Sequence, residues 1–169
     1  FIIKARLQGM RNIGPCPSPF NSFMFLQGIE TLPLRIRAQS ENAAQLAQRL
    51  KGHRCVDLVC YTGLADHPSH AVARRLFRGG FGAVLGFGIK GGRAAGEKFI
   101  NSVKLASHLA NVGDAKTLVL HPGSTSHQQM TDEAQRAAGV TPEFIRVAVG
   151  LEHIDDIIAD FDAALAASQ

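Results

Sequence analysis

The sequence predicts an α/β or α+β sandwich. Three observations support this prediction. Short apolar runs with strand-like composition alternate along the chain with longer runs of helical periodicity. At 169 residues, with 46% hydrophobic and 19% charged residues, the chain fits one globular domain that can bury a core. No repeat, linker or low-complexity tract interrupts the alternation.

A long helical stretch comes first, with Ser18 as a suitable N-cap residue and Pro19 at the first helical position. Pro33 is expected to kink this helix, because proline removes a backbone donor and clashes with the preceding turn. Gly52 is expected to end it. The apolar face beyond the kink consists of Ala43, Leu46, Ala47 and Leu50.

Strands and helices then alternate to the end of the chain. The expected strands are residues 55–61, 81–92, 117–122 and 144–149. The expected helices are residues 71–78, 93–103 and 131–139, and a final helix that follows the last strand. The apolar stripe of that final helix comprises Ile154, Ile157, Ile158, Phe161 and Leu165. Asp155 and Asp156 lie in its first turn, where the helix dipole favours negative charge.

The composition argues against several classes of protein. The net charge of +4 is mild, basic residues are scattered and there is one tyrosine, so the basic and aromatic surface of a nucleic-acid-binding protein is not predicted. The opening "FII" is too short for a signal peptide or a membrane span. Three cysteines without a CxxC pair favour reduced thiols and a cytoplasmic location.

Arg146 is a charged residue within the apolar run of the last predicted strand, and its position there needs a partner of opposite charge. Side chains alternate between the two faces of a strand. The face expected to meet the core carries Ile145, Val147 and Val149, and the other face carries Phe144, Arg146 and Ala148. Burying a guanidinium among apolar residues costs on the order of several kcal/mol unless an anion meets it. A planar guanidinium binds a carboxylate or a phosphate through two parallel bonds, so a ligand of this kind is one candidate partner. A structural salt bridge with a remote acid is the alternative.

Two other motifs have simpler interpretations. The segment "GGFGAVLGFGIKGG" lacks the GK[ST] ending of a phosphate loop, and glycines within a strand more often mark bulges or close backbone approach. The segments "HPSH" and "HPGSTSH" place histidines in pairs, but the spacing does not build a four-ligand zinc site, so no metal is expected. A nucleophile made from Ser124 or Ser126 with His127 lacks the strand-to-helix turn that such a serine needs. Polar loop-capping residues are the favoured interpretation.

Three long segments together resemble one known family. They are "SPFNSFMFLQGIETLPLRI", "HPSHAVARRLFRGGFGAVLGFGIKGG" and the stretch from "HLANVGDAK" through "RVAVGLE" to "DFDAAL". In this order they resemble the carboxy-terminal region of the cystathionine γ-synthase-like pyridoxal-phosphate enzymes. The "NVGDAK" segment is more similar to the O-acetylhomoserine sulfhydrylase branch, because the lyase branches usually carry serine where Asn111 stands.

The resemblance implies a fold and a binding site. The fold is the C-terminal small domain of the aspartate-aminotransferase-like fold type I enzymes, a small, mostly antiparallel sheet with helices packed on it. Residues 1–52 would be a connecting helical segment from a pyridoxal-phosphate domain, and residues 53–169 the small domain. Arg146 would bind the substrate's α-carboxylate, helped by Asn111 and the backbone of Val112. Ser124 and Thr125 would line the cleft less directly.

The resemblance also implies where the chemistry lies. Pyridoxal phosphate needs a lysine, and the family's lysine lies in a serine- and threonine-rich motif of the larger amino-terminal domain. The chain's own lysines, Lys4, Lys51, Lys90, Lys98, Lys104 and Lys116, are not in such a context. The absence of an initiator methionine and the helical start also suggest a fragment. We therefore expect no catalytic residue and no covalently bound cofactor in this chain, which would be inactive alone.

The longer protein implied by the resemblance joins O-acetylhomoserine to sulfide or a thiol, and the family is usually a homotetramer. Cystathionine γ-synthase and methionine γ-lyase are the alternatives within the family. From a different class, a free-standing module could sense an amino acid through Arg146. An interaction domain with a structural Arg146 is the third alternative. If the chain is a fragment, the apolar surface that includes "FNSFMFL" should be exposed and should favour self-association.

Overall fold

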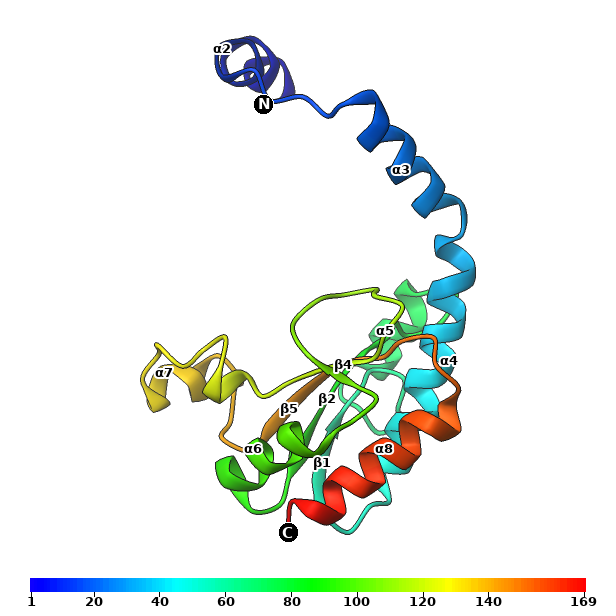
Figure 1. The fold of residues 1–169 in the computed structure, drawn as a ribbon, viewed down its shortest axis with the longest axis vertical. Helices are drawn as coiled ribbons and strands as arrows, with labels where there is room; N and C mark the ends of the chain where they lie inside the picture. The colour runs from blue at the N-terminus through cyan, green and yellow to red at the C-terminus, as the bar shows by residue number, and fades with distance from the viewer. The chain divides into compact units, whose positions relative to one another are not determined.

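The computed structural model describes residues 1–169, with the side chain of Asp132 excepted. Two compact units make up the chain, Phe1–Pro33 and Leu34–Gln169 (Figure 1). We describe each unit by itself. The boundary predicted at residues 52 and 53 concerns the domains of a longer protein, and it stays a prediction.

The first unit is helical. Its first run consists of α1 (Ile2–Lys4), the π-helical turn η1 (Ala5–Met10) and α2 (Arg11–Ile13), and Gly14 ends it in the left-handed conformation with φ +80°. The next helix is α3 (Pro19–Glu30), where the Ser18 hydroxyl accepts a hydrogen bond from the Asn21 N–H at 3.1 Å. The predicted cap at Ser18 is confirmed.

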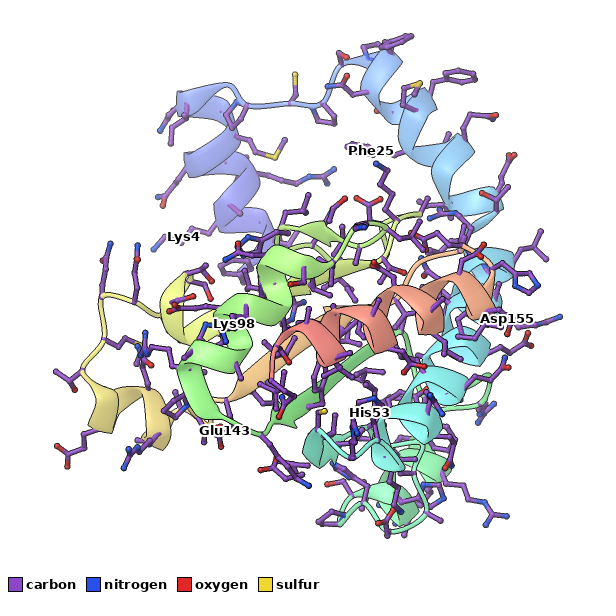
Figure 2. All side chains as sticks on the ribbon, turned by 60° about the horizontal axis from the view of Figure 1, so that its bottom comes forward. Lys4, Phe25, His53, Lys98, Glu143 and Asp155 are labelled. Atoms are coloured by element: carbon purple, nitrogen blue, oxygen red, sulfur yellow. The ribbon has the colours of Figure 1, made fainter. Side chains whose placement is uncertain are left out.

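The apolar side chains of α3 are exposed in the structure, as the sequence predicted. They are Phe20, Phe23, Met24, Phe25 and Leu26. Figure 2 labels Phe25 on this helix. Whether this surface drives self-association stays a prediction.

The long helix of the sequence analysis is interrupted near Pro33, as predicted. The turn at Thr31 separates α3 from α4 (Leu32–Lys51), and Gly52 follows the last residue of α4. Pro33 therefore occupies the first turn of α4, where its missing N–H costs no helical hydrogen bond.

A five-stranded sheet forms the centre of the second unit. Its strands are β1 (Val56–Cys60), β2 (Val84–Ile89), β3 (Ser107–His108), β4 (Leu118–Leu120) and β5 (Phe144–Ala148). Their order is β1-β2-β5-β4-β3, and every pairing is antiparallel except the parallel pairing of β3 with β4. The mostly antiparallel sheet is confirmed. The two-residue strand β3 was not predicted.

Three of the helices cover one face of this sheet. The elements between and after the strands are α5 (His70–Leu76), α6 (Gly92–Ser102), the 3-10 turn η2 (Pro122–Ser124), α7 (Asp132–Ala137) and α8 (Ile154–Ala167). Helices α6 and α8 lie side by side on the sheet (Figures 1 and 2). The core joins apolar residues of α4, α6 and α8 to those of the sheet, and it includes Leu46, Phe99 and Phe161. We call this side of the sheet the covered face and the opposite side the open face.

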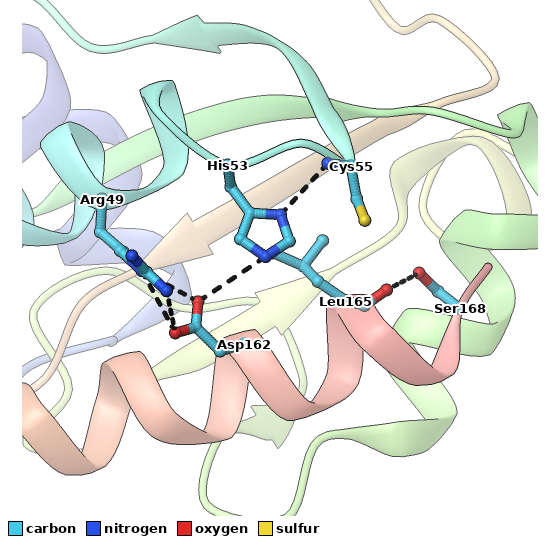
Figure 3. A network of polar contacts seen from close by, with 6 residues as sticks. All are labelled: Arg49, His53, Cys55, Asp162, Leu165 and Ser168. Atoms are coloured by element: carbon cyan, nitrogen blue, oxygen red, sulfur yellow. Dashed lines mark hydrogen bonds and ion pairs between the residues drawn. The ribbon is translucent and has the colours of Figure 1, made fainter.

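A polar cluster ties the end of α4 to α8 (Figure 3). The Arg49 guanidinium donates to both carboxylate oxygens of Asp162, with Nη2–Oδ2 at 2.6 Å. His53 Nε2 lies 3.9 Å from the same carboxylate, and His53 Nδ1 accepts the Cys55 N–H at 3.2 Å. The hydrogen bond and the negative charge of Asp162 both raise the pKa of the Arg49 guanidinium. The cluster orients α4 and α8 where β1 begins.

Across the residues that the structure describes, none of the helices is both long enough and apolar enough to cross a membrane.

Candidate functional site

Arg146 lies at the middle of the sheet. Strand β5 has β2 on one side and β4 on the other, and the Cα partners of Arg146 are Gly86 and Leu120. Partners in antiparallel strands share a face, so Gly86, Arg146 and Leu120 form one row across the sheet. Ile145 and Val147 are fully buried on the covered face. Arg146 therefore belongs to the open face, as the alternation of β5 predicted.

Gly86 leaves room in this row for larger neighbours. A Cβ added at Gly86 would overlap the ring of Phe144, which lies on the same face of β5. A Cβ added at Gly88 would approach the Asp57 carboxylate to 2.7 Å. The interpretation of these strand glycines as points of close approach is confirmed. Gly86 was not recognised as a neighbour of Arg146, because the sequence does not give the strand register.

The guanidinium of Arg146 has one hydrogen bond among the contacts described. Its Nη2 donates to the backbone oxygen of Asn111 at 3.3 Å. The ion pairs found between described side chains join Arg49, Lys51, His53 and His153 to acids, and Arg146 is in none of them. The alternative of a structural salt bridge thus has no acid partner within the described part of the chain. A half-buried guanidinium with spare donors is suited to bind an anion.

The loop that carries Asn111 is held in place from within the chain. The Asn111 side-chain oxygen accepts the Val112 N–H at 2.9 Å, and Val112 is 66% exposed. Two residues further on, the backbone oxygen of Asp114 accepts a hydrogen bond from Gln39 Nε2 of α4 at 2.6 Å. The structure therefore brings Arg146 together with Asn111. Their role in binding a carboxylate stays a prediction, as does that of Val112.

Ser124 and Thr125 follow β4, next to β5. The Ser124 hydroxyl lies 2.7 Å from His121 Nδ1, and the Thr125 hydroxyl donates to the backbone oxygen of His121 at 2.8 Å. Strand β4 places this loop near Arg146, because Leu120 is the partner of Arg146 and His121 comes next. Whether the two hydroxyls line a cleft stays a prediction.

The histidines of the "HPSH" segment, and His127 of "HPGSTSH", make contacts with loop residues. His67 Nδ1 accepts the Ser69 N–H at 3.1 Å, and His70 Nδ1 lies 2.8 Å from the Thr62 oxygen. Ser126 Oγ lies 2.9 Å from His127 Nδ1, but the pair is exposed and the two residues are adjacent in the chain. These contacts agree with loop-capping.

Two of the lysines are occupied by contacts within the second unit. Lys51 pairs with Asp66 at 2.7 Å, and Lys90 donates to the Arg54 oxygen at 2.8 Å. Neither contact fits a covalent site for pyridoxal phosphate, which needs a lysine amine that can reach the cofactor's aldehyde.

Comparison with known proteins gives the family. The sequence profile described as "Cys/Met metabolism PLP-dependent enzyme" matches residues 2–166. The chain belongs to this family. The fold type I resemblance of the small domain is thereby confirmed, together with the mixed sheet and its helices.

Individual members of the family are similar over nearly the whole chain. The O-acetyl-L-homoserine sulfhydrylase of Leptospira meyeri is 52% identical over 166 residues, which are 98% of this chain and 38% of that protein. The homocysteine synthase of Schizosaccharomyces pombe is 53% identical over 165 residues, again 98% of this chain and 38% of that protein.

A solved structure shows the same fold. It is described as an O-acetylhomoserine (thiol)-lyase from Campylobacter jejuni that holds a pyridoxyl-lysine phosphate group. It superposes with a TM-score of 0.91 at 34% identity, and the match covers 97% of this chain and 39% of that one. The chain thus spans about two fifths of the length of these family members.

Proposed function

We propose that this chain is the carboxy-terminal part of a pyridoxal-phosphate-dependent O-acetylhomoserine sulfhydrylase. The longer protein would form homocysteine from O-acetylhomoserine and sulfide, or methionine when methanethiol is the acceptor. The observation that supports a substrate role for this chain is the position of Arg146. It lies on the open face between Gly86 and Leu120, with no acid paired to it among the described side chains.

Arg146 would bind the α-carboxylate of the amino-acid substrate. Its remaining N–H groups can form two parallel bonds to a carboxylate, which lysine cannot do. The bond to the Asn111 oxygen would orient the guanidinium plane before the substrate arrives. Such positioning is a recognised contribution to rate, because it fixes the reacting carbon relative to the catalytic groups.

The reaction itself is a replacement at the γ carbon. The bond from that carbon to the acetate oxygen breaks, and a bond to the sulfur of the thiol forms. Pyridoxal phosphate would supply the electron sink for this chemistry. The lysine that binds it would come from the part of the longer protein that precedes this chain.

The first experiment tests the activity of the full-length protein. O-acetylhomoserine is supplied with sulfide, methanethiol or cysteine, and homocysteine, methionine or cystathionine is measured. Formation of homocysteine or methionine supports the proposal. Efficient turnover with cysteine alone would instead favour cystathionine γ-synthase, and breakdown of methionine without an acceptor would favour methionine γ-lyase.

A second experiment tests where the cofactor binds. The 169-residue chain alone is mixed with pyridoxal phosphate and reduced with borohydride, and the product is analysed by intact mass and peptide mapping. We expect no single stoichiometric lysine adduct. One clean adduct would contradict the proposal that the cofactor lysine lies outside this chain.

The free-standing module is distinguished by a binding measurement on the same chain. The chain and its Arg146→Lys variant, the matched control, are each titrated with O-acetylhomoserine in a calorimeter. Neither should bind tightly if the site needs the rest of the protein. Tight binding by the chain that Arg146→Lys abolishes would favour a sensor of amino acids.

We also propose a homotetramer and a cytoplasmic location for the longer protein. The homotetramer rests on the family resemblance, and the location rests on the cysteine usage.

A further inference from the structure

His121 is a buried histidine with two short side-chain contacts. It directly follows β4, and its relative exposure is 1%. Its Nδ1 lies 2.7 Å from Ser124 Oγ, and its Nε2 lies 2.7 Å from the backbone oxygen of Pro142. Ser124 belongs to the loop after β4, and Pro142 lies just before β5, the strand that carries Arg146.

The hydrogen bond at Nε2 decides which nitrogen of the neutral His121 ring carries the proton. A backbone oxygen has no hydrogen to give, so the Nε2 atom must carry the proton and donate it to Pro142. In the neutral ring Nδ1 is then the acceptor, and the Ser124 hydroxyl must donate to it. The imidazole thus bridges two segments with one donated and one accepted hydrogen bond.

The ring lies on the covered face, away from the proposed ligand. Leu120 shares the open face with Arg146, and the next residue of the chain turns to the opposite side. A Cβ added at Gly96 of α6 would lie 3.0 Å from His121 Cδ2, which places the ring against that helix. His121 therefore has no direct route to a molecule bound by Arg146, and any influence must act through the segments it joins.

The loop itself is further held by its neighbours. Arg93 of α6 and Gln135 of α7 both donate to the Gly123 oxygen at 3.3 Å. The backbone oxygen of His121 also accepts from the Thr125 hydroxyl at 2.8 Å. The Ser124 and Thr125 hydroxyl hydrogens are both directed at His121, so only their lone pairs remain for a ligand.

We propose that His121 is a positioning residue that sets the distance between the Ser124–Thr125 loop and the strand carrying Arg146. In this role the Ser124 and Thr125 hydroxyls accept hydrogen bonds from a ligand but do not donate to its carboxylate, which leaves that task to Arg146. The inference rests on the proposed function for its substrate. The bridge itself and the protonation of the ring are independent of it.

Two substitutions separate the ends of the bridge. An asparagine oxygen can take the place of Nδ1, so His121→Asn keeps the Ser124 bond and loses the Pro142 bond. A glutamine amide reaches as far as Nε2, so His121→Gln keeps the Pro142 bond and loses the Ser124 bond. Ser124→Ala removes the loop end alone. His153→Asn is the control, because His153 is an exposed N-cap residue of α8 and asparagine caps equally well.

The kinetics are measured on the full-length protein. Each His121 variant and Ser124→Ala should raise KM for O-acetylhomoserine about tenfold while kcat changes less than threefold. Adding Ser124→Ala to His121→Gln should raise KM by a smaller factor than Ser124→Ala does in the wild type, because the bond between the two residues is lost only once. A KM within twofold of wild type in Ser124→Ala and in the folded His121 variants would overturn the proposal. Because Ser124→Ala removes one hydroxyl from a partly exposed loop, it remains informative if the His121 variants do not fold.

A measurement without substrate completes the test. Nitrogen NMR of the histidine-labelled wild-type protein, with His121→Gln for assignment, reports which ring nitrogen carries the proton. We expect a proton on Nε2 and none on Nδ1. A proton on Nδ1 would overturn the assigned direction of the Ser124 bond, and with it the inference that the Ser124 hydroxyl can only accept from a ligand, even in an active enzyme. If the protein proves inactive with every homoserine ester, the proposed function fails while the NMR result still decides the arrangement of His121.

Discussion

The two faces of the sheet are built from the same strands but differ in burial and in the side chains they carry. On the covered face Phe87, Ile145 and Val147 are fully buried against helices. On the open face, Gly86 and Arg146 stand side by side, and Leu58 of β1 is 56% exposed. The period of two along each strand lets one segment anchor the fold and present a cation. The comparison teaches that the residues which hold β5 in place are not the residues which would bind a substrate.

The largest expected effect separates two phenylalanines on neighbouring strands. Phe87 on β2 is fully buried and packs edge-on against Phe99 at 5.4 Å between ring centroids. Phe87→Ala should lower the free energy of unfolding by about 3–5 kcal/mol, because a cavity replaces the ring. Phe144→Ala, on the half-buried open face, should cost less than half as much. Denaturant unfolding of the chain measures both, and equal losses would remove the distinction between the faces.

A smaller effect is expected at Gly86, on the open face. Gly86→Ala places a Cβ where the Phe144 ring lies, so the ring must move. We expect a loss of about 1–2 kcal/mol in the free energy of unfolding. Gly79→Ala is the matched control, since nothing lies within 4 Å of a Cβ added there. If the two alanine variants were equally stable, the close approach of Phe144 would not constrain this face.

The smallest expected effect on stability concerns Tyr61, the single tyrosine of the chain, and it appears only at alkaline pH. Its hydroxyl donates to the Gly82 oxygen at 3.0 Å, and burial raises the pKa of Tyr61 to about 12. An unfolded tyrosine ionises near pH ~10, so the folded chain holds this proton more tightly. The stability from this group is complete below pH ~10 and is lost as the pH rises towards 12.

Phenolate absorbance during an alkaline titration follows Tyr61 alone. We expect its midpoint near 12 in the folded chain and near ~10 in denaturant. The Tyr61→Phe variant should show less loss of stability over this pH range. A midpoint of ~10 in the folded chain would show that water reaches the Tyr61 hydroxyl and that burial does not raise its pKa.

Much of the fold could be predicted from local pattern. The alternation in β5 placed Arg146 opposite Ile145 and Val147, and Ser18 and Gly52 marked where helices begin and end. Family resemblance added the mostly antiparallel sheet. Strand β3 escaped prediction because two polar residues, Ser107 and His108, have no apolar periodicity and form a strand only through β4.

The candidate site was predicted in part, for a related reason. Arg146 was conspicuous because its charge interrupts an apolar run, and the resemblance pointed to Asn111. Gly86 as its neighbour depends on register between strands that are far apart in sequence, and local patterns do not give that register. The buried bridge of His121 depends on tertiary contacts with Pro142, although the apolar run that precedes it could have suggested burial.

The proposed role of Arg146 on the open face is to recognise a carboxylate. The most direct test compares O-acetylhomoserine with its α-carboxamide in the full-length protein, using wild type and Arg146→Lys. We predict that wild type prefers the carboxylate in kcat/KM by about 30-fold or more, and that Arg146→Lys loses most of this preference through a higher KM. An Arg146→Lys protein that keeps the wild-type KM and the full preference would show that Arg146 does not bind the carboxylate.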